Sequence, residues 1–415
     1  MRNTLALKAT LISALSLALL PAKLLAQEAA PLKVASQPEL CEISQQAIVH
    51  ASKIRGLSLK ETVPCVVQDK PEVEAFLQET IKVDLPPKKL QMEEVAYRSI
   101  GLIPDSFNYA TTLVEFLVSQ IGGYYDPKRK QFIMAAWLPA AVQFGVAVHE
   151  LTHALQDQHY GLLKIIDRKS GTTDTDIAIS ALVEGDASAV MFDYERSKAG
   201  QPALRYESSV DALILMQVLG ATMGSGDGEI PDSLKALLIF PYSSGLRFVH
   251  ALLRTGGYTE VSKAYQRLPN STREVLHPQE YRAGTFTPSI PELSQLESAT
   301  HTYLPEYSDV LGEFGISSLL SGEAPSRAVA SEAAMGWIGD RVGVFPVQAG
   351  KRLVSWLTRW ESKTDAEQFL QAYQKFIQAR YKKELPTSWT VLTPSKSGRM
   401  ISLASEVSVQ FLVQE

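Results

Sequence analysis

Beyond its first 26 residues the sequence lacks any apolar run long enough to span a bilayer, so no transmembrane anchor is expected in the mature chain. It also lacks an excess of basic residues: the formal net charge of −5 makes nucleic acid an improbable partner. Internal repeats and low-complexity tracts are missing as well. What is present, 415 residues of which 45% are hydrophobic, predicts a globular protein with two or three cores.

The first 26 residues have the pattern of a cleaved signal peptide. Arg2 and Lys8 precede the apolar run 9–20, and small residues follow around 22–26. Cleavage would remove three basic residues and take the charge from −5 to −5 − 3 = −8. No cysteine follows the apolar run, which argues against a lipid anchor. We therefore expect a secreted or periplasmic protein.

Cysteine is nearly absent, with only Cys41 and Cys65 in the chain. An oxidising compartment would allow these two residues to form a disulfide across a loop of about two dozen residues. The alternative is two ordinary buried thiols.

The chain divides by pattern into four segments and is predicted to be α+β. After the signal peptide 1–26 come an amino-terminal α/β lobe (27–88), a mainly helical domain with a short edge sheet (89–295), and a carboxy-terminal α+β domain (296–415). The expected helices are 38–52, 72–81, 140–158, 176–195, a helix from 240 to about 253, and 365–381; the last opens with a capping box of Thr364 and Glu367. The expected strands are 62–67, 131–137, 341–347, 353–360 and 389–393.

The helix 140–158 carries the pattern His149-Glu150-Leu151-Thr152-His153. A spacing of four residues puts both imidazoles on one helix face, one turn apart, where both can bind one zinc ion. Glu150 beside them can reach water at the metal and act as a general base. The flanking residues are uncharged, as expected for a buried helix with a polar metal face. The alternative is a pair of core histidines or a solvated helix face.

A catalytic zinc site needs a third protein ligand, for which the best candidate is Glu184. Its helical neighbours are small or apolar, so the carboxylate would be buried and would need a metal or an ion-pair partner. Gly185 is expected to let this helix approach the first metal helix closely. The rival ligand is His159, six residues after His153, but that spacing needs a glycine where the chain has Gln156.

Further residues are candidates for supporting roles. Asp157 and Asp186 could each orient a ligand imidazole, although each could equally be an ordinary helix acid. Tyr242 and His277 are candidates for stabilising the oxyanion of peptide hydrolysis. The strand 131–137 could receive a peptide by strand addition, or it could be a plain structural hairpin.

Together these residues resemble the gluzincin, or peptidase MA-like, superfamily. The string His149-Glu150-Leu-Thr-His153-Ala-Leu-Gln-Asp-Gln, the segment beginning Glu184-Gly-Asp-Ala and the segment Leu276-His277-Pro278 are similar to secreted bacterial proteins described as metallopeptidases. The likeness covers about residues 90–285 and, more loosely, Gly336-Trp337-x-Gly339-Asp340. It departs from thermolysin-like enzymes in the thirty residues between His153 and Glu184, where about twenty is usual, which implies an insertion at 160–175.

The resemblance implies one Zn²⁺ per chain, held by His149, His153 and Glu184, and hydrolysis of peptide bonds in a peptide or protein substrate with Glu150 as the general base. Two alternatives remain open at this point: a catalytically inactive zincin-fold binding or assembly protein of the cell envelope, and a zinc hydrolase of a non-peptide amide. The sequence does not specify the oligomeric state, the cleavage specificity or the role of the carboxy-terminal domain.

Overall fold

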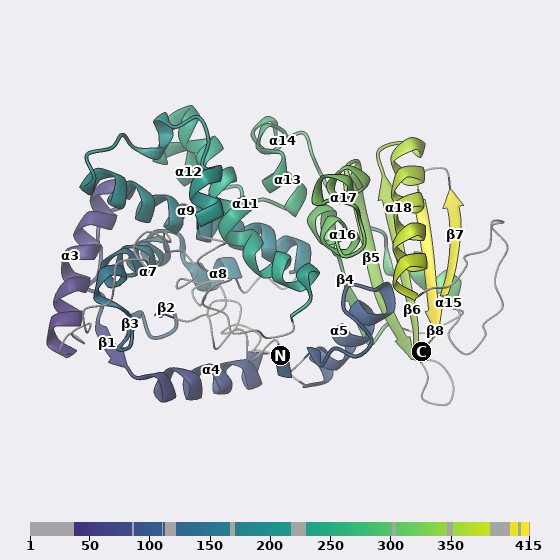
Figure 1. Cartoon of the computed structure of the whole chain (residues 1–415), viewed down its shortest axis with the longest axis horizontal. Helices are drawn as coiled ribbons and strands as arrows, with labels where there is room; N and C mark the ends of the chain where they lie inside the picture. Colours follow the sequence, from purple (N-terminus) through teal and green to yellow (C-terminus); the bar gives the residue numbers. More distant parts are fainter. Residues whose placement is uncertain are drawn as a thin grey trace.

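The computed structural model describes residues 37–84, 87–109, 111–112, 122–166, 171–216, 230–300, 304–346, 352–381, 399–405 and 408–414. These residues form a mixed α+β protein with two small sheets, which confirms the predicted fold class. The expected signal peptide 1–26 and the expected strand 389–393 lie outside the described residues. Figure 1 shows two bodies side by side, each with its own sheet.

The first body, on the left of Figure 1, is mainly helical. Its helices are α3 (Gln37–Arg55), α4 (Lys70–Asp84), α7 (Ala140–Tyr160), α8 (Leu162–Ile166), α9 (Thr173–Lys198), η2 (Leu204–Tyr206), α11 (Asp232–Gly256), α12 (Tyr258–Ala264), α13 (Thr272–Leu276) and α14 (Pro278–Ala283). Its sheet has the order β1-β3-β2, with β1 (Cys65–Gln68) parallel and β2 (Gly123–Asp126) antiparallel to β3 (Gln131–Ala135).

The second body contains the longer sheet. Its strands β4 (Tyr307–Asp309), β5 (Trp337–Pro346), β6 (Arg352–Trp360), β8 (Ser408–Gln414) and β7 (Arg399–Ser405) follow one another in that order, and every pair is antiparallel. Its helices are α5 (Pro87–Ile100), α15 (Leu293–Thr300), α16 (Gly312–Leu320), α17 (Arg327–Ala334) and α18 (Lys363–Tyr381).

The structure corrects the predicted boundary at residue 88. Residues of α3 share one hydrophobic core with α7, α9 and α11, and β1 pairs with β3, so 27–88 is not a separate lobe. In contrast, α5 contributes to the core of the second body, together with the start of α11 and residues of β5, β6 and α18. The first body is therefore assembled from segments on both sides of α5.

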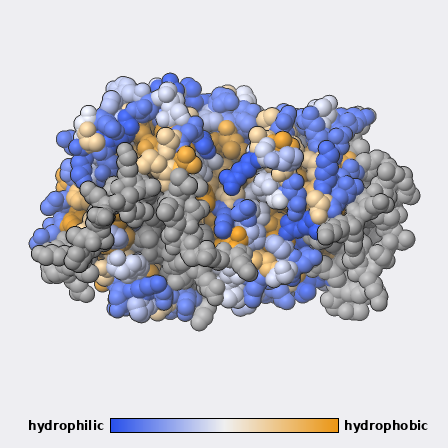
Figure 2. Space-filling model, in the orientation of Figure 1, coloured by the Kyte–Doolittle hydropathy of each residue, from blue (hydrophilic) through white to orange (hydrophobic). Residues whose placement is uncertain are grey.

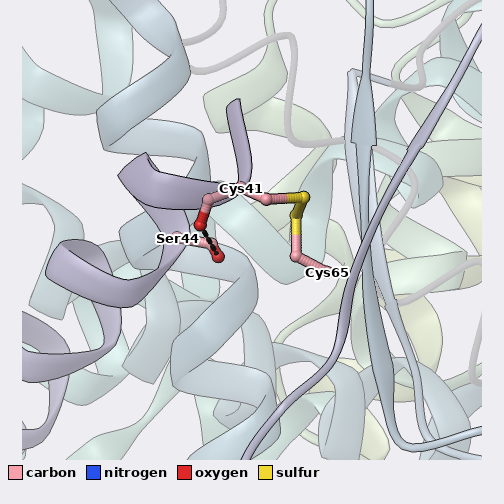
Figure 3. Close-up of a disulfide and its surroundings, with 3 residues drawn as sticks. All are labelled: Cys41, Ser44 and Cys65. Carbon is pink, nitrogen blue, oxygen red and sulfur yellow. Dashed lines mark hydrogen bonds between the residues drawn. A yellow bond between two sulfur atoms is a disulfide. The ribbon is translucent and has the colours of Figure 1, made fainter. Parts of the chain in front are cut away.

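The disulfide Cys41–Cys65, which the sequence left open, is formed. It joins the first turns of α3 to the beginning of β1, and the hydroxyl of Ser44 donates to the carbonyl of Cys41 beside it (Figure 3). The disulfide therefore attaches α3 to the sheet that lies next to α7.

The helix α11 departs from two expectations. It begins eight residues earlier than the expected residue 240 and continues through Pro241, whose missing N–H leaves one helical hydrogen bond unmade. By length and composition it is also the one described helix that could cross a membrane, which the sequence reading did not anticipate. However, 61% of its most apolar 18-residue stretch is buried inside the protein, as in the core helix of a globular protein.

The face of the molecule shown in Figure 2 is largely hydrophilic where it is not grey, with apolar residues in small groups.

The start of the last helix of the second body differs from the prediction. Helix α18 is capped by Ser362, whose hydroxyl accepts from Asp365 N and donates to its carboxylate, and not by Thr364 with Glu367. The reason is that the helix begins at Lys363, two residues earlier than the expected residue 365.

The segment that begins Gly336-Trp337 has a structural role. The buried Asp340 accepts four hydrogen bonds, from the backbone of Leu311 and Gly312 and from the indoles of Trp337 and Trp356. Burial raises the pKa of Asp340 to about 6, and these donors oppose the rise. The carboxylate thus connects β5, β6 and the start of α16.

Helix α9 connects the two bodies. At its first residue Thr173 donates to Asp309, and the backbone N–H of Asp174 donates to the carbonyl of Val310. The side chain of Asp174 accepts from Thr272 at the start of α13. One end of α9 is therefore fixed at the second body, while its middle passes through the core of the first.

Candidate metal centre

Two histidines lie one turn apart on α7. The helix begins after Pro139, as predicted, and ends at Gly161, whose positive φ of 70° forms a left-handed cap. The rings of His149 and His153 are fully buried, with centroids 4.9 Å apart and Nε2 atoms 3.2 Å apart. Both Nε2 atoms therefore face the same point.

Glu184 on α9 faces that point as well. Its Oε2 lies 3.0 Å from His149 Nε2, and its Oε1 lies 3.6 Å from His153 Nε2. The ligand atoms of the three residues all lie within 4.8 Å of one another, and this is the one such group of His, Cys, Asp or Glu among the described residues. The structure thus brings together the three side chains that the sequence singled out, His149, His153 and Glu184, which we call the metal group.

The donor set fits a divalent metal. Two imidazole nitrogens and one carboxylate oxygen are the ligands that zinc takes in catalytic sites. Glu184 Oε1 and His149 Nδ1 are buried and have no hydrogen-bond partner in the described part of the chain. A fully buried carboxylate between two imidazoles with an unsatisfied oxygen is costly unless a cation compensates it.

The electrostatics of the group couple the carboxylate to the two imidazoles. Burial would raise the pKa of Glu184, but the two histidines hold it below its ordinary value. Burial would lower the pKa of His153, but Glu184, and to a lesser degree Glu150, raise it to about 9. Burial lowers the pKa of His149. A metal ion at this position would compete with a proton for His153.

Glu150 is fully buried beside this group. Its Oε2 accepts a hydrogen bond of 3.0 Å from the backbone N–H of Tyr125 on β2, and its charge contributes to the raised pKa of His153. The carboxylate is thus held between the two-histidine face of α7 and the strand β2.

The predicted role of strand 131–137 needs correction. The strand exists as β3, but it is the central strand of its sheet and pairs with β1 and β2. Its backbone groups are used on both sides, so it cannot receive a peptide by strand addition. The edge strand nearest the metal group is β2, which carries the N–H that binds Glu150.

Of the two oxyanion candidates, the structure places Tyr242 beside the metal group. Its ring lies 6.5 Å from the ring of His149, at an interplanar angle of 24°. His277 lies between α13 and α14 and bonds Glu313 of α16 at 2.8 Å. That hydrogen bond and the charge of Glu313 raise the pKa of His277. The side-chain hydrogen bond described for His277 is with the second body and not with a metal ligand.

Two other candidates are directed away from the metal. His159 Nε2 lies 2.7 Å from the carbonyl of Ser58, so the rival third ligand is not in the group. Because α7 continues as a helix through Gln156, His159 cannot return to the metal face. Asp157 accepts from the hydroxyl of Tyr125 and from the backbone of Leu162, and not from an imidazole. Of the two roles that the sequence left open for Asp157, the structure thus excludes the support of a ligand imidazole.

The support comes instead from Gln156, which the sequence reading treated only as a helix-compatible residue. Its Oε1 lies 2.8 Å from His153 Nδ1, and its Nε2 donates to Asp186 at 3.0 Å. Asp186, the other predicted supporting acid, thus acts on the metal ligand through Gln156. The available signal was the spacing of three residues from His153, which places the amide on the same helix face.

The predicted close approach at Gly185 is made to a different helix. A Cβ on Gly185 would lie 2.2 Å from the carbonyl oxygen of Gly245 on α11, and a Cβ on Gly245 would lie 2.3 Å from the carbonyl oxygen of Ala181. Both glycines are therefore needed for the contact between α9 and α11. The prediction named α7 as the partner, which is wrong.

Comparison with known proteins adds one match. Residues 302–407 match a family described as a domain of unknown function (DUF8575). This segment begins before β4 and ends between β7 and β8, so it includes neither α7 nor α9. No curated protein and no solved structure matches the chain.

Proposed function

We propose that this protein is a secreted or periplasmic zinc-dependent metallopeptidase of the gluzincin type. One observation carries the proposal: His149, His153 and Glu184, which lie on two different helices, place three buried ligand atoms within 4.8 Å of one another. The adjacent Glu150 completes the set of groups that peptide hydrolysis needs.

His149 Nε2, His153 Nε2 and one oxygen of Glu184 would hold the zinc ion. Zinc in such a site is a Lewis acid that polarises a carbonyl oxygen and makes water more acidic. The chain supplies the remaining functions. A zinc ion held by these three protein ligands would keep room for water and substrate.

Glu150 is the proposed general base. It accepts a proton from the attacking water on one carboxylate oxygen and later transfers it to the leaving amine. The hydrogen bond from Tyr125 N–H to Oε2 orients the carboxylate. Tyr242, beside His149, is the proposed donor to the oxyanion that develops on the scissile carbonyl.

The proposed location outside the cytoplasm is supported by the signal-like sequence at residues 1–26 and by the disulfide Cys41–Cys65, which persists in an oxidising compartment. Edman sequencing of the protein recovered from periplasm and medium tests this part. A first residue near position 27 supports it, and an intact amino terminus at Met1 contradicts it.

The function is tested with Glu150→Gln in the mature chain. This variant keeps the shape and the hydrogen bond to Tyr125 but cannot take up the proton, so kcat/KM on a peptide library should fall by about 10²–10⁴-fold with unchanged zinc content. Asp157→Asn, on the same helix but away from the metal, is the matched control and should retain activity. Wild type that binds zinc but cleaves no peptide would exclude the peptidase and favour a zincin-fold binding protein, and equal cleavage by Glu150→Gln and wild type would contradict the role of Glu150 as the general base.

A further inference from the structure

The buried side chains around His153 form a chain of hydrogen bonds that reaches α3. Gln156 Oε1 lies 2.8 Å from His153 Nδ1, and Gln156 Nε2 donates to Asp186 Oδ2 at 3.0 Å. Asp186 in turn accepts from Arg55 Nε, with contacts of 2.7 and 2.9 Å to its two oxygens. Gln156 and Asp186 are fully buried, and Arg55 is 1% exposed.

The orientation of the Gln156 amide follows from its neighbours. Its Nε2 has two acceptors, the carbonyl of Val183 at 3.1 Å and Asp186 Oδ2 at 3.0 Å. An amide oxygen in that place would meet two acceptors, so Oε1 must face His153. Since Oε1 can only accept, the hydrogen must be on His153 Nδ1, and Nε2 is left to face Glu184 and the metal position.

Asp186 is held in place by more than one donor. The hydroxyl of Tyr265 donates to its Oδ2 at 3.0 Å, and Arg55 is positioned by a further hydrogen bond of 3.0 Å to Ser262. Burial alone would lower the pKa of the Arg55 guanidinium, but the charge of Asp186 raises it above its ordinary value. A buried carboxylate without such a counter-charge would not keep a fixed geometry.

The two ligand histidines differ in this support. His149 Nδ1 is buried and has no hydrogen-bond partner among the described residues. His153 alone has an acceptor for its Nδ1–H. The orientation of His153 therefore depends on residues outside the metal group, and one of them, Arg55, belongs to a helix that the sequence assigned to a separate lobe.

We propose that Arg55, Asp186 and Gln156 are positioning residues that fix the Nδ1–H tautomer and the ring orientation of His153 and thereby increase zinc affinity. This inference rests on the proposed metal centre. It assigns to α3, through Arg55, a part in metal binding that its sequence does not indicate. Partners of this kind typically change metal affinity by about 10–100-fold.

The test is a zinc affinity measurement on the full mature chain, by competition with a chromophoric chelator. Gln156→Leu removes the acceptor for Nδ1–H and should weaken zinc binding by about 10–100-fold. Gln156→Asn retains an amide that is too short to reach both His153 and Asp186, and should weaken binding in the same direction. Asp186→Asn should give a smaller loss, because the amide still accepts one hydrogen bond.

Gln143→Leu is the matched control. Gln143 is also a buried glutamine on α7, and its Nε2 donates to the carbonyl of Leu138, away from the metal group. A purely structural role would lower the melting temperature of the Gln156 and Gln143 variants alike without changing affinity. The positioning role predicts an affinity loss for Gln156 alone, together with a changed visible spectrum of the Co²⁺-substituted protein.

The outcomes separate this inference from the proposed function. Unchanged zinc affinity and an unchanged Co²⁺ spectrum in folded Gln156→Leu and Gln156→Asn would overturn the inference and leave the metal centre intact. Wild type that binds no zinc would overturn both. Loss of activity in Glu150→Gln with normal zinc affinity would support the proposed peptidase and would not affect this inference.

Discussion

Replacement of Gly185 by alanine should disrupt the metal centre without altering a ligand. An added Cβ would lie 2.2 Å from the carbonyl oxygen and 2.4 Å from the carbonyl carbon of Gly245. Ordinary contacts begin at 3.4 Å, so α9 and α11 would have to separate by 3.4 − 2.2 = 1.2 Å. Both contacting atoms belong to backbone, so no side chain can rotate away.

The magnitude follows from two opposing effects. Overpacking of this kind costs about 3 kcal/mol, the upper end of the usual range, because the clash is with backbone. Alanine recovers about 1 kcal/mol through its better helix propensity, which leaves a net loss of about 2 kcal/mol in the free energy of unfolding. Because Glu184 is the adjacent residue, a shift of about 1 Å moves its oxygen out of the narrow range of zinc–ligand distances, and zinc affinity should fall at least about tenfold.

The assay is urea unfolding of the metal-free protein together with zinc titration, with Gly145→Ala as the control. Gly145 lies on α7, and a Cβ there would meet Glu195 Oε1 at an ordinary distance of 3.5 Å. This variant should gain about 0.5–1 kcal/mol and keep its zinc affinity. A Gly185→Ala protein with wild-type stability and zinc affinity would refute the argument from close helix packing.

Three further predictions concern the disulfide and two titrating groups. Replacement of Cys41 and Cys65 by serine should lower the free energy of unfolding by about 3 kcal/mol, since the bond closes a loop with a sequence separation of 24; equal urea midpoints would contradict this. Zinc affinity should rise about tenfold per pH unit from pH 6 to 8, because the pKa of His153 is about 9 and binding displaces its proton; a flat profile in chelator competition would contradict this. Burial raises the pKa of Asp174 to about 8, so the folded state holds a proton that the unfolded state releases, and stability should fall as pH rises toward and through 8. Asp174→Asn, which can still accept from Thr272, should flatten that decline in urea unfolding from pH 5 to 9.

The sequence predicted the metal group well because its features are local. A spacing of four residues on an uninterrupted helix determines that His149 and His153 share a face. Glu184 was identifiable because a carboxylate among small and apolar helical neighbours has to be buried. Position 156 is glutamine and not the glycine that would let the chain leave the helix. The sequence therefore also indicated that His159 would not reach the metal.

The pairing of distant segments was less predictable. The sequence does not show that β1 lies parallel to β3, and this pairing makes β3 central and joins the amino-terminal segment to the first body. Nor does it specify that Gly185 faces Gly245 on α11 and not a residue of α7, because both α7 and α11 contain small residues that allow a close approach. The arrangement of α5 in the second body is a further non-local feature.

Side-chain partnerships across helices were also beyond the sequence. From the sequence, Asp157 and Asp186 were equally good candidates for supporting an imidazole. Only the rotation of α7 relative to β2 determines that Asp157 accepts a hydrogen bond from Tyr125 instead. Arg55 lies 131 positions from Asp186 and carries no motif. The Ser362 cap differs from the expected Thr364 cap because a capping box is compatible with either register.

Metal analysis of the purified mature chain tests the central claim most directly. Wild type should contain about one zinc per chain, Glu184→Ala should contain none, and His159→Ala should keep it, since His159 bonds Ser58 and lies outside the metal group. Retention of zinc by Glu184→Ala with loss in His159→Ala would contradict the ligand assignment, and the absence of zinc from wild type would contradict the metal centre itself.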